Sequence, residues 1–220
     1  MHRKVTDKLR VFALTPGRTG STTLFKAFSH STNFSVGQQS NWGLLGDNRI
    51  EYPDQHIESD ARNFFFMDWL AERYSPDSTH WIVLQRDISE VVASYSRRRS
   101  KSGIVYTFGT GVLGLKRLSS DSDWMEVAEV FVRNAQIQID KFIEGRPNVH
   151  HIELANPVPT FSEIWHTIGA GDGLDAACRE WTIRYNRSPV KAGPFNQVQR
   201  GRRALCEPIA AWISQRGRAS

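Results

Sequence analysis

A turn rich in glycine and hydroxyl side chains, at residues 16–23, holds the first residues suited to chemistry. It follows a short apolar run at residues 11–15 and precedes apolar side chains that repeat at helical spacing from Leu24 to Phe28. A turn between a strand and a helix aims backbone N–H groups and the helix N-terminus at one point, which suits an anion. Because Arg18 adds positive charge, the sequence predicts a phosphate-binding loop, with an ordinary Gly/Ser turn as the alternative.

This turn lacks the lysine that a nucleoside triphosphate site requires. A Walker A loop has the form G-x-x-x-x-G-K-[ST], whereas here Ser21 follows Gly20. In that motif the lysine reaches the β- and γ-phosphates, and a magnesium ion completes the site. We therefore expect the turn to hold phosphate-like groups other than a nucleoside triphosphate with magnesium.

A second candidate anion site follows the apolar run at residues 80–85. Arg86 comes at the end of this predicted strand, where open α/β sheets bind their ligands. Asp87 is a predicted N-cap, and Glu90 three residues later predicts a capping box at the start of a helix. Ser94 lies about two turns into that helix, so one anion could contact both its hydroxyl and the Arg86 guanidinium. The alternative is that Arg86 pairs with a surface carboxylate and Ser94 is only a small helical residue.

Taken together, the two segments resemble the family of sulfotransferases that use 3′-phosphoadenosine 5′-phosphosulfate (PAPS). Residues 16–22 match the family's 5′-phosphosulfate loop, P-x-[RK]-[ST]-G-[ST]-T. Arg86 and Ser94 match its 3′-phosphate motif, an arginine at a strand end and a serine eight positions later. The chain departs from the family at Ile88, where proline is common, and residues 200–202 are a weak counterpart of its C-terminal nucleotide-closing element.

The resemblance implies a P-loop NTPase-like sulfotransferase fold and transfer of a sulfuryl group from PAPS to a hydroxyl or amine. The product would be PAP, and no metal ion is implied. The resemblance implies that Arg86 and Ser94 bind the 3′-phosphate and that Arg18 stabilises the charge that grows on the bridging oxygen. The residues assigned to the 5′-phosphate are Arg18, Thr19, Gly20, Ser21, Thr22 and Thr23. The expected acceptor is a small molecule or a glycan.

Between the two motifs, residues 52–60 form the densest group of titratable side chains, and a general base is expected there. His56 and Glu58 are the joint candidates, since an extended segment would place both on one side. The alternative is a solvated polar loop. A metal site is not expected, because neither His56 with Glu58 nor the pair His150 and His151 has third and fourth ligands at suitable spacing.

Strands and helices alternate in the predicted order of elements. Strands are predicted over residues 11–15, 80–85 and 148–154. Helices are predicted from residue 24, over 62–74, from residue 88 and over 124–143, and residues 31–59 are predicted to be irregular. This alternation predicts an α/β fold in which helices flank a parallel sheet.

Composition is consistent with one globular domain spanning residues 1–220. Hydrophobic residues make up 40% of the chain and charged residues 23%, which is ordinary globular usage. No apolar run reaches membrane-spanning length, and the first residues lack the apolar core of a secretory signal. Two cysteines are too few for a disulfide scaffold, so we expect a cytoplasmic protein without stable membrane insertion. The oligomeric state is left open.

The net charge of +5 favours an anionic partner without identifying it. A P-loop-type kinase would use the same turn, with Asp87 as a magnesium ligand, but the missing lysine argues against it. A non-catalytic nucleotide- or nucleic-acid-binding protein would explain the charge. Nucleic acid is not the expected partner, because no nucleic-acid motif is present and two separate anion sites would be unexplained.

Overall fold

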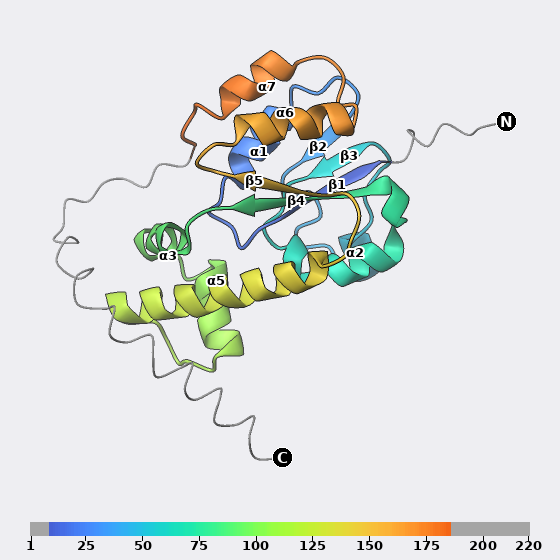
Figure 1. Cartoon of the computed structure of the whole chain (residues 1–220). Helices are drawn as coiled ribbons and strands as arrows, with labels where there is room; N and C mark the ends of the chain where they lie inside the picture. The colour runs from blue at the N-terminus through green and yellow to red at the C-terminus, as the bar shows by residue number, and fades with distance from the viewer. Residues whose placement is uncertain (1–8, 186–220) are drawn as a thin grey trace. The chain divides into compact units, whose positions relative to one another are not determined.

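The computed structural model describes residues 9–185, and Figure 1 shows the arrangement of their elements. The strands are β1 (Arg10–Leu14), β2 (Ser35–Gly37), β3 (His56–Glu58), β4 (Thr79–Gln85) and β5 (Val149–Glu153). The α-helices are α1 (Ser21–Phe28), α2 (Met67–Arg73), α3 (Ile88–Arg97), α4 (Ile104–Thr107), α5 (Asp121–Ile143), α6 (Val158–Thr167) and α7 (Leu174–Glu180). Short helices of other types are η2 (Gly46–Arg49), η3 (Asn63–Phe65), η4 (Pro76–Ser78) and η5 (Phe108–Val112).

The five strands form one all-parallel sheet in the order β2-β3-β1-β4-β5. In the centre, Arg10 is level with Thr79 and Leu14 with Val83. Helices flank both faces of the sheet, so the predicted α/β class with a parallel sheet is confirmed. Because all strands run the same way, the segments that follow them meet at one edge, which positions the candidate site.

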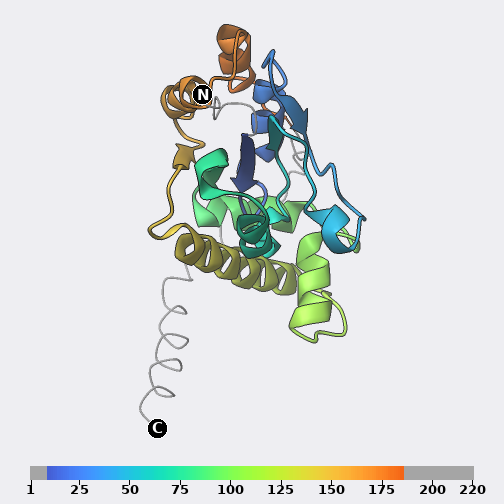
Figure 2. The same ribbon diagram turned by 90° about the vertical axis from the view of Figure 1, so that its right-hand side faces the viewer.

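Alternating side chains of the central strands supply two hydrophobic cores, one on each face of the sheet. Val11 and Ala13 pack with α1, α6 and α7, whereas Phe12 and Leu14 pack with α2, α3 and α5. Figures 1 and 2 show these two helical layers on opposite sides of the strands. Both faces of β1 are therefore buried, which explains its continuous apolar sequence.

The prediction that residues 31–59 are irregular was wrong in part. This segment contains η2 and two strands, β2 and β3, of three residues each. β3 pairs with β1 and β2 pairs with β3, so both belong to the sheet. All three residues of β3 are buried, although His56 and Glu58 are polar.

The four predicted helices are present as α1, α2, α3 and α5, although α1 and α5 begin three residues earlier than predicted and α4, α6 and α7 were not predicted. Two further corrections concern α2 and α3. The helix predicted over residues 62–74 is shorter, because η3 precedes α2 and α2 ends at Arg73. At α3 the Asp87 side chain accepts a hydrogen bond from the Glu90 N–H, as predicted, but the Glu90 carboxylate pairs with Arg86 instead of completing a capping box.

The single-domain prediction for residues 1–220 stays a prediction, since the residues after 185 lie outside the described part. Residues 200–202, the weak counterpart of a C-terminal element, fall there too. Among residues 9–185, no helix is both long and apolar enough to cross a membrane.

Candidate functional site

The carboxyl edge of the sheet brings five segments together. The glycine-rich loop follows β1, Gln38 follows β2 and Ser59 follows β3. Arg86 follows β4, and Leu154 follows β5. Two contacts join these segments to α1: the Ser59 hydroxyl donates to the Ser21 carbonyl at 2.8 Å, and the Gln38 amide donates to the Thr22 hydroxyl at 3.0 Å.

The loop after β1 takes a conformation that suits anion binding. Gly17, Arg18 and Gly20 have positive φ angles of 85°, 64° and 103°. Gly20 caps α1 without a side chain, so no side chain of the cap accepts a bond from the first helical N–H groups. Those N–H groups and the helix dipole favour an anion at this end. Phosphate binding by this loop stays a prediction, with which the backbone conformation is compatible.

Two side chains hold the loop in this shape. The Thr15 hydroxyl accepts a hydrogen bond from the Gly17 N–H at 2.9 Å and pairs with the Thr19 hydroxyl. On the other side, the Tyr95 hydroxyl donates to the Pro16 carbonyl at 2.6 Å. Burial raises the pKa of Tyr95, so the phenol keeps its proton and stays a donor. Because the Thr19 hydroxyl is hydrogen-bonded to Thr15, this predicted 5′-phosphate contact already has a partner within the protein.

Arg18, Arg86 and Ser94, which the sequence singled out, lie together in the structure. Arg18 Nε donates to Ser94 Oγ at 3.0 Å, and Arg86 Nη1 donates to the Arg18 carbonyl at 3.0 Å. Arg86 Nε also pairs with the carboxylate of Glu90 at 2.8 Å, and Glu90 lies in the first turn of α3. The Ser94 hydroxyl thus contacts Arg18 rather than Arg86. Arg86 pairs with a carboxylate, as the alternative interpretation of this residue expected.

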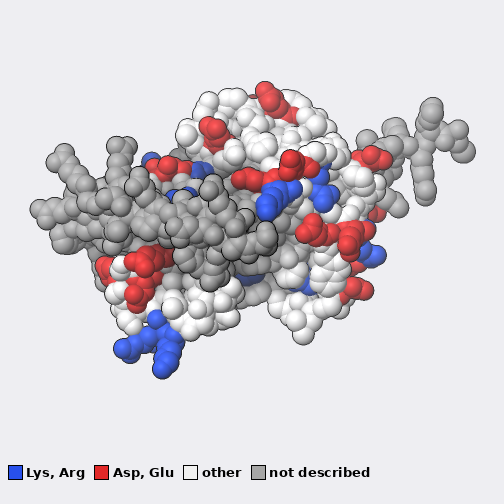
Figure 3. Space-filling model, turned by 60° about the horizontal axis from the view of Figure 1, so that its bottom comes forward, with Lys and Arg blue, Asp and Glu red and all other residues white. Residues whose placement is uncertain are grey.

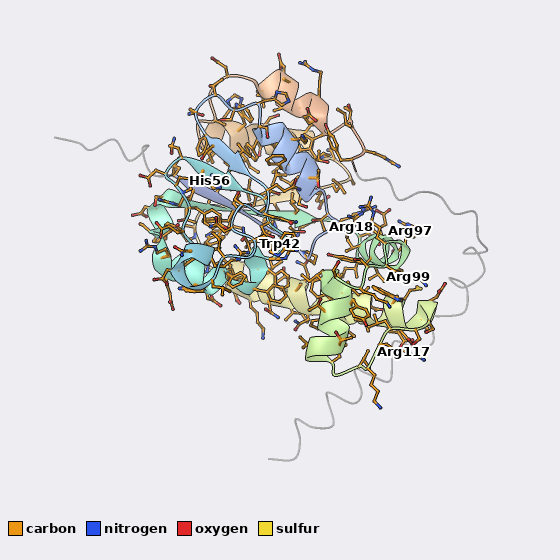
Figure 4. The ribbon with its side chains drawn as sticks, turned by 180° about the vertical axis from the view of Figure 1, so that it is seen from behind. Arg18, Trp42, His56, Arg97, Arg99 and Arg117 are labelled. Carbon is orange, nitrogen blue, oxygen red and sulfur yellow. The ribbon has the colours of Figure 1, made fainter. Side chains whose placement is uncertain are left out.

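The site is strongly positive. Burial lowers the pKa of Arg18, and the guanidinium groups of Arg98, Arg86 and Arg97 lower it further, while Tyr95 opposes them. A bound anion would relieve this crowding of like charges, because it favours the charged form of each arginine. In Figure 4, Arg18 and Arg97 are labelled close to each other, Arg18 in the loop after β1 and Arg97 at the end of α3.

His56 and Glu58 are brought together, but on β3 and below the level of the loop. His56 Nε2 lies 3.2 Å from Glu58 Oε2, and Glu58 Oε1 accepts the Ser40 N–H at 3.3 Å. His56 is level with Arg10, four residues before the end of β1, which is about 13 Å along the strand. Figure 4 shows His56 well apart from Arg18.

The Glu58 carboxylate is fully buried and stays charged. Burial pushes its pKa upward, but hydrogen bonds from His56 and Ser40 outweigh burial, and the pKa lies below its ordinary value. Gly37 makes the room, because a Cβ there would overlap the Glu58 carboxylate and the Ser40 hydroxyl. These contacts exclude the solvated polar loop that was the alternative for this segment.

Asp60 is the buried carboxylate nearest the edge, and it is already paired. Arg49 Nη2 lies 2.8 Å from one carboxylate oxygen, and Arg62 Nη1 lies 3.4 Å from the other. The Arg62 guanidinium also lies over the ring of Trp42, 4.6 Å from its centre. Within residues 9–185, no three His, Cys, Asp or Glu side chains gather as a metal site would require.

Sequence reasoning missed Tyr95, Gln38 and Ser59. Tyr95 is next to Ser94 in the chain, but only packing of α3 beside the loop brings its hydroxyl to Pro16. Gln38 and Ser59 follow strands too short to give a periodic signal. Without a strand signal in the sequence, neither Gln38 nor Ser59 could be placed at a strand end.

The chain was also compared with known proteins. No family model matches it, and no curated protein matches it. What the site binds is therefore judged from its own residues.

Proposed function

We propose that the protein is a sulfotransferase that transfers a sulfuryl group from PAPS to a hydroxyl or amine of a small-molecule or glycan acceptor. One observation carries the proposal: the loop after β1 is joined directly to the arginine that follows β4. The link is the hydrogen bond from Arg86 to the Arg18 carbonyl. PAPS has phosphate groups at both ends of its ribose, so adjacent but separate anion sites suit it.

The residues of this edge fit the donor nucleotide. The first N–H groups of α1 and the hydroxyls of Ser21 and Thr22 are suited to the 5′-phosphate, next to Gly20. Arg86 and Ser94 are suited to the 3′-phosphate, and both are hydrogen-bonded to Arg18 of the loop. PAPS would supply a sulfuryl group on a good leaving group, and Arg18 would stabilise the charge left on the bridging oxygen.

His56 and Glu58 are the proposed general base. A general base must come within hydrogen-bond reach of the acceptor proton. Both side chains are buried and bonded to each other, and Glu58 lies nearer the loop because it is level with Phe12. Direct proton transfer would need the acceptor to reach this buried face of β3.

Thermal unfolding with added ligands tests the nucleotide. We expect PAP to stabilise the protein in EDTA, because the candidate site contains arginine and N–H donors but no lysine after Gly20. Ligand at 100 times its Kd adds about 2.7 kcal/mol to the free energy of unfolding. ATP with magnesium and a short oligonucleotide serve as comparison ligands. Stabilisation by either of these, with none by PAP, would refute the sulfotransferase proposal.

A further inference from the structure

Two loops carry most of the large apolar side chains that residues 9–185 expose. The Trp42 loop, residues 41–46, exposes Trp42 by 67% and Leu45 by 85%, with Leu44 beside them. The Val112 loop, residues 111–117, exposes Val112 by 69%. Its other exposed apolar side chains are Leu113 and Leu115. Single exposed apolar residues are common, but such grouping at loop tips indicates an interaction surface.

The glycines of both loops face open space. A Cβ added at Gly43, Gly46, Gly111 or Gly114 would meet no atom within 4 Å. Three of these glycines, at 43, 46 and 114, have positive φ angles, which are typical of glycine in tight turns. Neither loop packs its apolar tip onto a core, so the tips are available to a partner.

The two loops lie on the same side of the molecule. In Figure 2 the light-blue segment that precedes η2 and the light-green segment around η5 both reach toward the right-hand edge. Figure 4 looks onto this side and labels Trp42 and Arg117 on it, together with Arg18 of the candidate site. A flat surface could therefore contact both loops at once.

Positive charge accompanies the apolar tips. Lys116 and Arg117 are exposed and directly follow Leu115 in the Val112 loop. The Arg62 guanidinium lies under the Trp42 ring. Figure 3 shows Lys and Arg side chains that project as a group at the lower left, with uncharged surface to their right. Neither loop contains a carboxylate, although Asp47 follows the Trp42 loop directly.

We propose that this side of the protein binds peripherally to the surface of an anionic lipid bilayer. Tryptophan is favoured at the level of lipid headgroups, and apolar side chains beside it enter the boundary of the acyl region. Lysine and arginine next to them attract anionic headgroups. A bilayer is flat and accepts two separate apolar tips, whereas a protein partner calls for one continuous, complementary patch. Such binding does not require sulfuryl-transfer activity.

Co-sedimentation with vesicles tests the proposal. We expect the protein to sediment with vesicles of phosphatidylcholine and phosphatidylserine at 70:30, and several-fold less with phosphatidylcholine alone. Changing both Leu45→Ser and Val112→Ser is expected to weaken binding at least about tenfold, because each loses an apolar side chain that the bilayer would bury. Lys116→Gln is expected to weaken binding about fivefold, and only when phosphatidylserine is present.

A matched control uses α5, which lies outside the two loops. Val130 and Ile137 are exposed by 45% and 55% there, so Val130→Ser with Ile137→Ser also removes two exposed apolar side chains, although less exposed ones than Leu45 and Val112. This control is expected to bind vesicles as the wild type does. Insertion is tested with brominated lipids, which should quench the wild type more than Trp42→Phe, since that variant keeps its apolarity but loses this tryptophan.

Three results would overturn the proposal. The first is no co-sedimentation with anionic vesicles at 0.1 M salt. The second is equal loss of binding in the loop and α5 variants, once circular dichroism has shown that all of them are folded. The third is a dimer in analytical ultracentrifugation that the loop variants dissociate, which would assign the surface to a second copy of the chain.

Discussion

Replacing Gly17 by alanine tests whether the loop after β1 depends on the geometry described above. Gly17 has a φ of 85°, and an alanine Cβ there would overlap the Tyr95 hydroxyl. The backbone conformation costs alanine about 1–2 kcal/mol. Displacing the Tyr95 hydroxyl from the Pro16 carbonyl adds about 0.5–1.5 kcal/mol for the lost hydrogen bond. We therefore expect Gly17→Ala to lower the free energy of unfolding by roughly 2–3 kcal/mol.

The steric part of this cost can be isolated in a second background. Tyr95→Phe removes the overlapping oxygen, and the next ring atom, Cζ, lies 3.5 Å from the position of the alanine Cβ, which is ordinary contact. In that background Gly17→Ala should cost only the backbone term, so the two changes should couple by about 1 kcal/mol. Gly111→Ala, where the new Cβ meets nothing within 4 Å, is the control and should change stability by less than about 0.5 kcal/mol. Urea unfolding measures all four variants, and equal costs in both backgrounds would refute the steric argument.

Three further predictions concern the charged groups. Arg86→Ala should weaken PAP binding about 10- to 150-fold in calorimetric titration but change binding of adenosine 5′-phosphosulfate much less; equal losses would exclude Arg86 as the 3′-phosphate contact. Glu58→Gln and His56→Ala should each lower turnover about 10²- to 10⁴-fold if the pair supplies the base, whereas loss of stability with normal turnover would make it structural. Burial beside His150 lowers the pKa of His80 to about 4. Because the unfolded chain binds this proton near pH 6.5, stability should fall as the pH drops from about 6.5 toward 4, and His80→Gln should flatten that part of a melting-temperature profile.

The central fold was predictable because its strongest signals are local. β1 and β4 lie in the middle of the sheet, and burial on both faces gives them continuous apolar sequences. β2 and β3 escaped prediction because three residues show no period, and their strand conformation comes from pairing with neighbours that are distant in the chain. The polar side chains of β3 can be buried because His56 and Glu58 bond each other, while Ser35 bonds His56 and Ser40 bonds Glu58.

In the candidate site, too, local sequence signals were predictable and contacts between distant segments were not. Arg18, Arg86 and Ser94 were found because each stands at a fixed offset from a strong strand or helix signal. Their pairing was not found, because it depends on how α3 packs beside the loop: Ser94 faces Arg18, and Tyr95 reaches Pro16. The contact between Arg86 and Glu90 did have a local signal, since Glu90 lies in the first turn of the helix that begins directly after Arg86 and Asp87.

That last contact implies a competition at the proposed 3′-phosphate site. Arg86 Nε donates to the Glu90 carboxylate, whose side chain is 59% exposed, so a phosphate that binds Arg86 must share or displace it. An exposed ion pair of this kind is worth about 0–1 kcal/mol, and removing it should therefore tighten PAP binding by up to about fivefold in Glu90→Gln. Glu129→Gln is the matched control, because Glu129 pairs with Arg133 at the same spacing and at 2.9 Å on α5, and it should leave binding unchanged. Calorimetric titration of PAP at low salt measures both variants. Weaker binding in Glu90→Gln alone would mean that the carboxylate positions Arg86 rather than competing with the phosphate.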